Sequence, residues 1–434
     1  MKNIQGYKGT RDFYPDDMRV QNWLFKKASE VLQKLCFEEY QGPLVESVDL
    51  YSKKTSEEIV QEQLYSFLDK GDRHIAIRPE MTPTLARMLA KVHKQLSKPI
   101  KWYSQSVCMR FERPQRGRLR EFYQLNVDIF GGSALDEDVE VLRTVFELLK
   151  SYNAPESSFV IKLSHRQCMS NILVALFPNL QDNLREVFKL IDKMHKISKE
   201  SFEQSLFGLG FKNEDIHELQ SLFKVPLEDL KERFTQVSSY LTHIDKLIFA
   251  LKSLYPKINI ELDLSIMRGF DYYTGMIFEV YDAHPDNKRA MFGGGRYDNL
   301  IASFDADKLS GVGFGMGDVT LLNFLESHSL IPKLEREIDV CIGRFSENDR
   351  IVSLILSQKL LKLGLNVHSQ MTNLGFGKQI QHAVKLKAKA FVFQGGEDIE
   401  AQTFQVKWLK SGQQEQFSYD DSGLSAFYES LIRR

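Results

Sequence analysis

Arginine side chains are concentrated at the junction of two predicted strands. Residues 101–112 and 119–130 are rich in apolar and aromatic residues typical of strands, and residues 113–120 at their junction read RPQRGRLR. The arginines here are Arg110, Arg113, Arg116, Arg118 and Arg120. Guanidinium groups at this density repel one another unless an anion lies among them, and their planar shape suits phosphate. A solvated hairpin tip would not need so many cations, so we expect a binding site for a nucleotide, a nucleic acid or both.

Two other segments place polar groups next to predicted strands. Residues 78–83 read RPEMTP, where Thr82 before Pro83 predicts a helix N-cap. Glu80 would then either stabilise the helix dipole or bind a ligand. Residues 268–275 read RGFDYYTG and join two predicted strands. They form a tight turn, or they supply a cation for developing charge and hydroxyls for a polar ligand.

Glycines are dense in two later segments. Residues 293–298 read GGGRYD, which is either a turn or a place where the backbone approaches a ligand closely. Residues 311–317 read GVGFGMG, but no βαβ unit surrounds them, so a dinucleotide-binding loop is poorly supported. Alternate glycines on a strand would leave one face flat, either for a purine ring or for close packing.

Several classes of protein are excluded by composition. The chain has 57 Lys and Arg against 58 Asp and Glu, so it does not grip nucleic acid through overall positive charge. Its ten histidines and four cysteines form no cluster at metal-ligand spacing, so we expect no metal site, and no serine hydrolase motif is present. Scattered cysteines, and the absence of a signal peptide or long apolar run, favour a cytoplasmic protein that does not associate with membranes.

The 434 residues predict two or three domains built from different elements. A helix is expected over 20–40, and strands over 75–78, 101–112, 119–130, 258–266 and 276–281, whose period of two favours an antiparallel sheet. Residues 166–254 carry successive amphipathic helical patterns and read as a helical insertion. After Pro332, strands alternate with helices, which indicates a small α/β domain. There, Lys378 and Lys385 belong to a lysine run that is either a solvated helix face or an RNA contact.

In their order along the chain, these motifs resemble those of class II aminoacyl-tRNA synthetases, specifically the histidyl-tRNA synthetase family. The resemblance rests on GTRDF at 9–13, the helix leading into Gly42-Pro43, RPEMT at 78–82, the arginine-rich hairpin through Gln124, and the segments at 268–274 and 293–298. It implies an α+β catalytic domain with a six-stranded antiparallel sheet over residues 1–165 and 255–328. It also implies the insertion at 166–254, an α/β anticodon-binding domain at 335–434, and a homodimer.

The resemblance implies a reaction in two steps. L-Histidine and ATP would give histidyl-adenylate and pyrophosphate, and the histidyl group would then pass to the 3′ end of tRNA(His). Arg110 and Arg268 would act on the α-phosphate, because fixed cations aimed at developing charge lower the barrier. Mg²⁺ would bridge the phosphates. The full set implied for ATP is Arg110, Glu112, Arg113, Arg120, Arg268, Gly315 and Gly317.

The resemblance also assigns residues to the amino acid and to the tRNA. Those implied to surround the α-ammonium group are Glu80, Thr82 and Gln124. Those implied to read the imidazole are Asp128 and Tyr273, with Tyr272 alongside. A site that satisfies both imidazole nitrogens would reject substrates that leave a buried group unpaired. Those implied to contact tRNA are Arg116, Arg118, Lys378 and Lys385.

One position departs from the family pattern. Thr320 stands where family members carry an arginine that binds the γ-phosphate of ATP. Threonine donates a hydrogen bond but does not neutralise phosphate charge. Another cation could replace the arginine, or the chain could be a non-catalytic relative, similar to the histidine-binding regulatory subunit of ATP phosphoribosyltransferase. A tRNA-binding module without catalysis is a third alternative.

Overall fold

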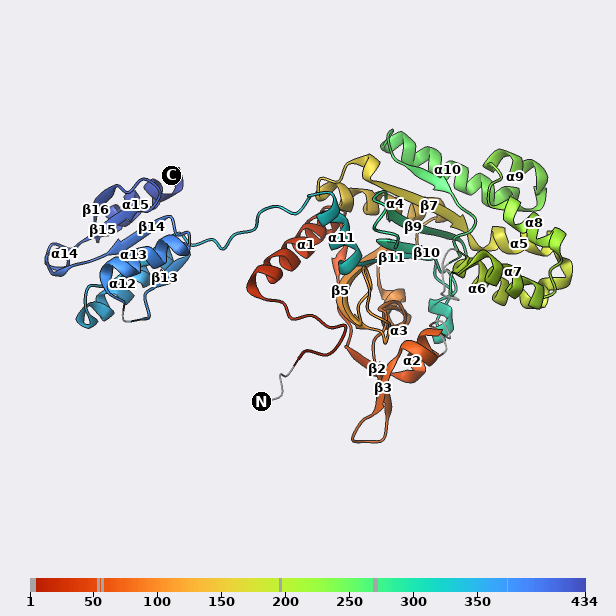
Figure 1. Ribbon diagram of the computed structural model, residues 1–434, viewed down its shortest axis with the longest axis horizontal. Coiled ribbons are helices and arrows are strands. Elements are labelled where there is room, and N and C mark those ends of the chain that lie inside the picture. The colour runs from red at the N-terminus through yellow and green to blue at the C-terminus, as the bar shows by residue number, and fades with distance from the viewer. Residues whose placement is uncertain (1–4, 53–54, 56–57, 195–196, 268–271, 373) are drawn as a thin grey trace. The chain divides into compact units, whose positions relative to one another are not determined.

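The computed structural model describes residues 5–52, 55, 58–194, 197–267, 272–372 and 374–434. The chain divides into two compact units, Met1–Pro332 and Lys333–Arg434. We call them the first unit and the second unit and describe each by itself (Figure 1). No helix among the described residues is long and apolar enough to cross a membrane.

The first unit is built on an eight-stranded sheet with the order β1-β5-β6-β11-β10-β9-β7-β8. Its six central strands pair antiparallel throughout. They are β5 (Ile100–Met109), β6 (Glu121–Phe130), β11 (Gly311–Gly317), β10 (Phe292–Arg296), β9 (Met276–Asp282) and β7 (Phe159–His165). The expected six-stranded antiparallel sheet is therefore present. Two short strands, β1 (Glu38–Glu39) and β8 (Ile260–Leu262), extend it by parallel pairing at its edges.

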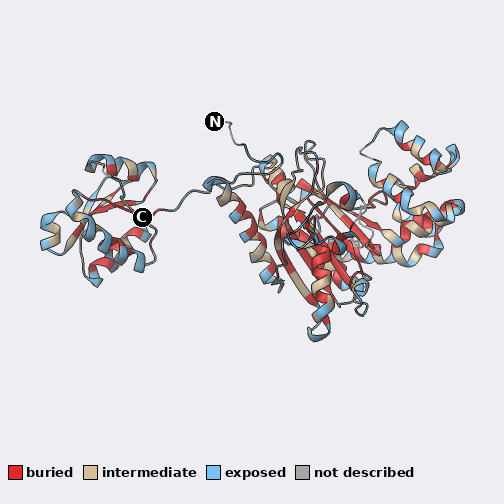
Figure 2. Ribbon diagram, turned by 90° about the horizontal axis from the view of Figure 1, so that it is seen from below, coloured by how far each residue is buried: buried red, intermediate tan, exposed pale blue. Residues whose placement is uncertain are grey.

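Helices cover both faces of this sheet. On one face, α1 (Pro15–Lys34), α4 (Ala134–Ser151) and α11 (Asp318–Ser327) share a hydrophobic core with alternate residues of the strands, including Val127 and Phe278. On the other face, α3 (Thr82–Val92) packs with Phe130 and Ile277. Because successive strand residues point to opposite faces, the polar residues Asn126 and Asp128 of β6 lie on the α3 face. Figure 2 shows the sheet and the inner sides of its helices as buried.

Smaller elements complete the α3 side. The strands β2 (Val45–Ser47), β4 (His74–Ile77) and β3 (Tyr65–Leu68) form a separate three-stranded sheet in that order. The helix α2 (Val48–Ser52) follows β2, and its Leu50 and Tyr51 are buried against Ala76 of β4.

The residues expected to form a helical insertion contain helices and no strand in their described part. These helices are α5 (Arg166–Leu176), α6 (Leu184–Lys193), α7 (Lys199–Gly208), α8 (Asn213–Leu222), α9 (Leu227–Arg233) and α10 (Ser238–Leu254). They enclose a hydrophobic cluster of their own, while Ile244, Leu247 and Leu251 of α10 join the core of the sheet. The helical pattern over residues 228–254 is not one continuous helix, because a 3₁₀ turn at Thr235–Val237 separates α9 from α10. The domain boundary itself stays a prediction.

The second unit contains a mixed five-stranded sheet with the order β13-β12-β14-β15-β16. Its strands are β12 (Val340–Ile342), β13 (Val367–Ser369), β14 (Ala390–Phe393), β15 (Thr403–Trp408) and β16 (Gln414–Ser418). Its helices are α12 (Arg350–Lys362), α13 (Phe376–Lys385), α14 (Gly396–Glu400) and α15 (Asp421–Arg433). The strands β13, β12 and β14 are parallel and alternate with helices, as the sequence pattern predicts, whereas β15 and β16 form an antiparallel hairpin.

Candidate active site

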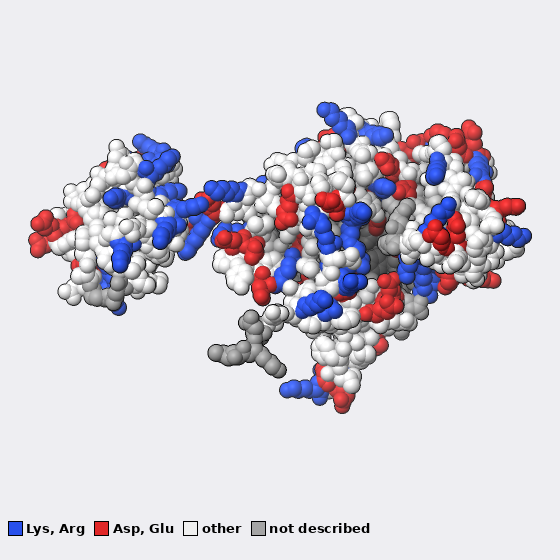
Figure 3. Space-filling model, viewed as in Figure 1, with Lys and Arg blue, Asp and Glu red and all other residues white. Residues whose placement is uncertain are grey.

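A polar pocket lies on the α3 face of the large sheet. Its lining comes from the N-terminal end of α3, the strands β6, β10 and β11, and the segment before β9. The lining residues are Glu80, Thr82, Arg110, Gln124, Asn126, Asp128, Tyr272, Tyr273, Gly293, Tyr297, Gly313, Phe314 and Gly315. The pocket therefore brings together every residue that the sequence assigned to histidine, with Arg110 and Gly315 from the set assigned to ATP. On the face shown in Figure 3, Lys and Arg side chains gather beside a hollow in the first unit.

The glycines of β11 make room for the polar side chains of β6. Gly313 pairs with Asp128 and Gly315 with Asn126 in the strand register. A Cβ at Gly313 would overlap Asp128 Oδ1, and a Cβ at Gly315 would lie 2.5 Å from Gln124 Nε2. The segment 311–317 is thus a strand and not a dinucleotide-binding loop. The side chains of Asp128 and Gln124 lie against the face that these two glycines leave free. Of the two interpretations of the glycines, close packing is therefore supported here.

Asp128 presents an unsatisfied oxygen inside the pocket. Its side chain is buried, Oδ1 accepts a hydrogen bond from Tyr297 Oη, and Oδ2 has no partner among the described residues. Burial raises the pKa of Asp128 to about 7, and the hydrogen bond from Tyr297 opposes that rise. A buried oxygen without a partner costs free energy, so this carboxyl favours a ligand that carries an N–H group.

Glu80 is fixed by two hydroxyl groups. Oε1 accepts a hydrogen bond from Thr55 Oγ1 at 2.8 Å, and Oε2 accepts one from Tyr272 Oη at 3.1 Å. A carboxylate is negatively charged and its oxygens accept hydrogen bonds, so Glu80 suits a bound cation. The prediction that Thr82 caps α3 was wrong: Met81 is the N-cap residue, and Thr82 is the first residue of the helix. Its buried side chain lines the pocket instead.

The arginines around residues 113–120 differ in their surroundings. Arg110 Nε donates to the carbonyl oxygen of Pro79 at 2.9 Å, which holds its guanidinium at the pocket. Arg116 Nε donates to Asn287 Oδ1 at 3.0 Å. Arg113 is exposed and makes no hydrogen bond or ion pair with any residue that the structure describes. These three arginines therefore do not share one set of partners.

Two more arginines of this run are engaged within the hairpin. Arg118 Nε lies 2.5 Å from Glu112 Oε2, so each of these residues already has a charged partner. Arg120 Nη1 donates to Tyr7 Oη at 2.8 Å, and its guanidinium lies 4.2 Å from the centre of the Phe111 ring. The sequence alone did not reveal these partners. The assignment of Glu112 and Arg120 to ATP, and of Arg116 and Arg118 to tRNA, stays a prediction.

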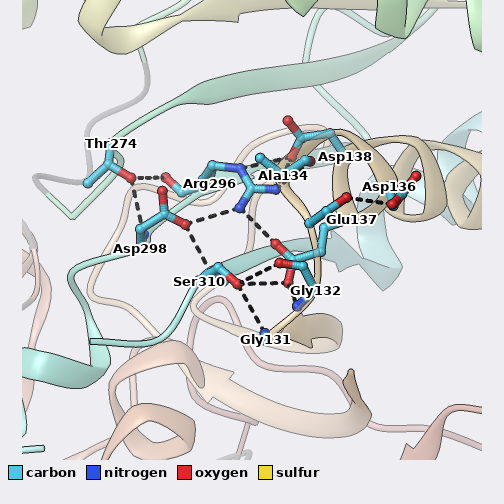
Figure 4. Close-up of polar contacts among 12 residues, drawn as sticks. Gly131, Gly132, Ala134, Asp136, Glu137, Asp138, Thr274, Arg296, Asp298 and Ser310 are labelled. Carbon is cyan, nitrogen blue, oxygen red and sulfur yellow. Dashed lines mark hydrogen bonds and ion pairs between the residues drawn. The ribbon is translucent and has the colours of Figure 1, made fainter. Parts of the chain in front are cut away.

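Arg296 anchors the segments that carry the pocket tyrosines (Figure 4). Its buried guanidinium lies 2.6 Å from Asp138 Oδ1 and 2.8 Å from Glu137 Oε2, both on α4. Its carbonyl oxygen accepts a hydrogen bond from Thr274 N at 2.7 Å. Arg296 thus holds the end of β10 and the residues after Tyr273 in place. The interpretation of 293–298 as a turn was wrong, because residues 292–296 form β10 in the middle of the sheet.

Sequence reasoning missed two residues of the pocket, Asn126 and Tyr297, and one buried residue outside it, Asp318. Asn126 stands between Gln124 and Asp128 at the spacing of one strand face, and this spacing could have indicated it. Tyr297 belongs to the 293–298 segment, but only the fold shows that its hydroxyl bonds Asp128. Asp318 is buried at the start of α11 and accepts hydrogen bonds from Arg11 Nη2 and the Tyr123 backbone N–H, so its role is structural.

The remaining predicted residues lie in three different places. Arg268 and Asp271 are outside the described residues. Gly317 is the N-cap residue of α11, and Thr320 in the first turn donates from Oγ1 to the Gly317 carbonyl oxygen at 3.1 Å. Lys378 and Lys385 are exposed on α13 of the second unit. The described residues contain no group of three or more His, Cys, Asp or Glu that would hold a metal ion.

Comparisons with known proteins agree along most of the chain. The family model "Histidyl-tRNA synthetase" matches residues 9–319, and "Anticodon binding domain" matches residues 346–423. The chain is similar to the histidine–tRNA ligase of Leptospira biflexa, at 39% identity over 96% of both chains. It is 33% identical to that of Natronomonas pharaonis over 95% of both chains. Identity to the chloroplastic/mitochondrial ligase of Arabidopsis thaliana is 32%, over 95% of this chain and 85% of the relative.

Solved structures share the fold. Histidyl-tRNA synthetase from Nostoc superposes with a TM-score of 0.77 at 22% identity over all of both chains. An ATP phosphoribosyltransferase regulatory subunit/histidyl-tRNA synthetase from Bacillus halodurans gives 0.72 at 21% identity, over 90% of this chain and 98% of that one. The family match over residues 9–319, with relatives 32–39% identical along nearly the whole chain, shows that this protein belongs to the histidyl-tRNA synthetase family.

Proposed function

We propose that this chain is a histidine–tRNA ligase. It activates L-histidine with ATP to give histidyl-adenylate and pyrophosphate, and it transfers the histidyl group to the 3′ end of tRNA(His). The observation that carries this proposal is the pocket itself, which places the buried, unsatisfied Asp128 Oδ2 in one cavity with Glu80 and the Arg110 guanidinium. These groups match the imidazole N–H, the ammonium group and the phosphate of the two substrates.

The amino acid would lie along β6. Glu80 and Gln124 offer acceptor oxygens to the α-ammonium group, with Thr82 beside them, and Asp128 and Tyr273 reach the imidazole. Tyr297 holds the Asp128 carboxyl in place, and Tyr272 holds Glu80, so both acceptors are oriented before the substrate arrives. A substrate without an imidazole N–H would leave Asp128 Oδ2 buried and unpaired, which is the basis for selectivity.

Activation forms a bond between a histidine carboxylate oxygen and the α-phosphorus, and it breaks the bond to the pyrophosphate leaving group. Negative charge grows on the α-phosphate oxygens as the bond forms, so a fixed cation lowers the barrier. Arg110 is held at the pocket by Pro79 for this role, and we assign the second cation to Arg268. Mg²⁺ would enter with the nucleotide, because triphosphate oxygens are its preferred ligands and the described residues hold no cluster for a resident ion.

The second unit would bind the tRNA. It matches the anticodon-binding domain model, and the exposed Lys378 and Lys385 on α13 carry no ion pair with a described residue. Cationic side chains free of acidic partners suit contacts with a phosphate backbone. By contrast, the neighbouring Lys387 and Lys389 pair with Glu335 and Asp339 at 2.7 and 2.8 Å.

We also propose a homodimer. In the three-stranded sheet, Val45, Phe67 and Leu68 are exposed to solvent, as is Leu44 just before β2, by 39–65%. Apolar side chains grouped in this way favour burial against a second surface. Sedimentation equilibrium on the full chain measures the state directly, and Leu68→Asp should shift it toward monomer.

The first test of the function is exchange of labelled pyrophosphate into ATP, with Mg²⁺ and without tRNA. Exchange that requires L-histidine would support adenylate formation and show that Thr320 is compatible with it. A folded protein that binds histidine without exchange would instead favour the regulatory paralogue. Binding of tRNA without either activity would favour the non-catalytic tRNA-binding alternative.

A further inference from the structure

The connection between β9 and β10 is tightly fastened to its surroundings. Asp282 at the end of β9 has a fully buried side chain, and it accepts hydrogen bonds from Asn287 Nδ2 at 2.6 Å and His328 Nε2 at 2.7 Å. Asn287 Oδ1 in turn accepts a hydrogen bond from Arg116 Nε at 3.0 Å. The loop is therefore tied both to the residue after α11 and to the arginine-rich hairpin. A loop held at both sides presents its side chains in fixed positions.

Arg289 of this loop reaches the place where Thr320 faces the hairpin. A Cβ at Gly117 would lie 3.2 Å from Arg289 Cδ and 3.3 Å from Thr320 Cγ2, so both side chains pack over the same point of the hairpin. Thr320 Oγ1 also lies 3.5 Å from the carbonyl oxygen of Met291, two residues after Arg289. The β9–β10 loop thus brings the positively charged side chain of Arg289 to the same point of the hairpin as Thr320, which carries no charge.

The charge of Arg289 is not neutralised by the described residues. Its side chain is half-buried and makes no hydrogen bond or ion pair with any residue that the structure describes. Burial lowers the pKa of Arg289, and so does the positive charge of Arg118, while Glu112 opposes this effect. Glu112 already pairs with Arg118 at 2.5 Å. A partly buried guanidinium beside a second cation is unfavourable unless an anion joins them.

We propose that Arg289 binds the terminal phosphates of ATP and supplies the cation that Thr320 lacks. This inference rests on the proposed function. The terminal phosphates fit better than the α-phosphate, because Arg110 and Gly315 line the amino-acid pocket whereas Arg289 and Thr320 do not. Thr320 lies beyond Gly317, past the end of β11 that carries the pocket glycines. A triphosphate directed from the pocket along β11 would bring its outer end to Arg289.

The test compares Arg289→Ala with Lys288→Ala, which removes an exposed cation from the same loop. Titration calorimetry would measure the affinity of each full-length variant for MgATP and for AMP, which lacks the terminal phosphates. A charge-assisted hydrogen bond is worth roughly tenfold or more in affinity. Arg289→Ala should weaken MgATP by about that factor and leave AMP unchanged, while Lys288→Ala should match the parent. Equal losses of MgATP and AMP, no loss of MgATP, or an equal effect of Lys288→Ala would each overturn the proposal.

A second variant tests whether both side chains serve one place. Thr320→Arg in the Arg289→Ala background should restore most of the MgATP affinity, because the new guanidinium starts from the residue that packs beside Arg289. A double variant that keeps the parental melting temperature and yet stays as weak as Arg289→Ala would refute the shared position. These binding measurements do not depend on aminoacylation. If the unmodified chain shows no histidine-dependent pyrophosphate exchange, the proposed function is refuted. The role of Arg289 in nucleotide binding is still decided by the binding measurements.

Discussion

Replacement of Asp128 by Asn should stabilise the first unit at alkaline pH and have progressively less stabilising effect as the pH falls. Burial raises the pKa of Asp128 from 3.8 to about 7. In the unfolded chain the carboxyl loses its proton near pH 3.8, whereas in the folded chain it keeps the proton until about pH 7. Its contribution to folding is therefore fully present below pH 3.8 and is lost as the pH rises toward 7. Asparagine does not titrate, so the Asp128→Asn variant does not lose stability in this way as the pH rises.

The magnitude follows from the size of the shift. One pKa unit corresponds to about 1.4 kcal/mol, so the complete titration removes roughly 4 kcal/mol from the wild-type free energy of unfolding. Between pH 5 and pH 8 the advantage of the Asn variant should grow by about 3 kcal/mol. Asparagine has the same shape and still accepts the hydrogen bond from Tyr297 Oη through its amide oxygen, so the pocket should keep its packing.

Urea unfolding at several pH values measures this difference. The chain has three tryptophans, and Trp408 lies in the second unit, so a Trp408→Phe background makes fluorescence report the first unit through Trp23 and Trp102. Asp229→Asn at an exposed position of α9 controls for the loss of one carboxyl group. A stability difference between the parent and the Asp128→Asn variant that is constant from pH 5 to pH 8 would show that the buried carboxyl is ionised throughout and would refute the reasoning.

Three further substitutions test other parts of the site. Arg296→Met leaves two buried carboxylates of α4 without their main cation, so the free energy of unfolding should fall by roughly 3–5 kcal/mol in urea denaturation, and a fall below 1 kcal/mol would contradict the anchoring role. Tyr297→Phe removes the hydrogen bond that lowers the pKa of Asp128, so that pKa should rise. The KM for histidine in pyrophosphate exchange should then reach its minimum at higher pH, and an unshifted pH profile would count against the contact. Gly315→Ala should displace the flexible end of Gln124 and raise the histidine KM about tenfold with little change in melting temperature, whereas a large drop in melting temperature would mean that the backbone had moved.

Elements with a strong local pattern could be predicted from the sequence. The hairpin of β5 and β6, the helices of 166–254 and the parallel strands of the second unit all follow from their apolar periodicity. On β6, the resemblance to the family assigns Gln124 and Asp128 to histidine, and the structure places both in the pocket, on one face of the strand. Such predictions succeed because one short segment contains the whole signal.

The central strand β10 could not be predicted from its own residues. Three consecutive glycines, Gly293 to Gly295, have a low strand propensity and suggest a turn. In the sheet, a Cβ at Gly294 would overlap the Gly313 carbonyl oxygen, and one at Gly295 would lie 2.9 Å from the Tyr273 ring. The neighbouring strands and the pocket tyrosine therefore exclude larger side chains here. This requirement comes from distant residues, so the segment alone does not contain it.

In the arginine-rich hairpin, the partners of the charged side chains could likewise not be predicted from the local sequence. Five arginines near one turn predict a site for a nucleotide, a nucleic acid or both, but the sequence did not show that Arg116 bonds Asn287 of the β9–β10 loop or that Arg120 bonds Tyr7 near the start of the chain. Sequence spacing does not reveal which cations already have partners. Arg289, far from both the hairpin and Thr320 in sequence, packs over Gly117 of the hairpin, as Thr320 does. A missing phosphate-binding residue is therefore better sought among the unpaired cations around the vacated position than among its neighbours in sequence.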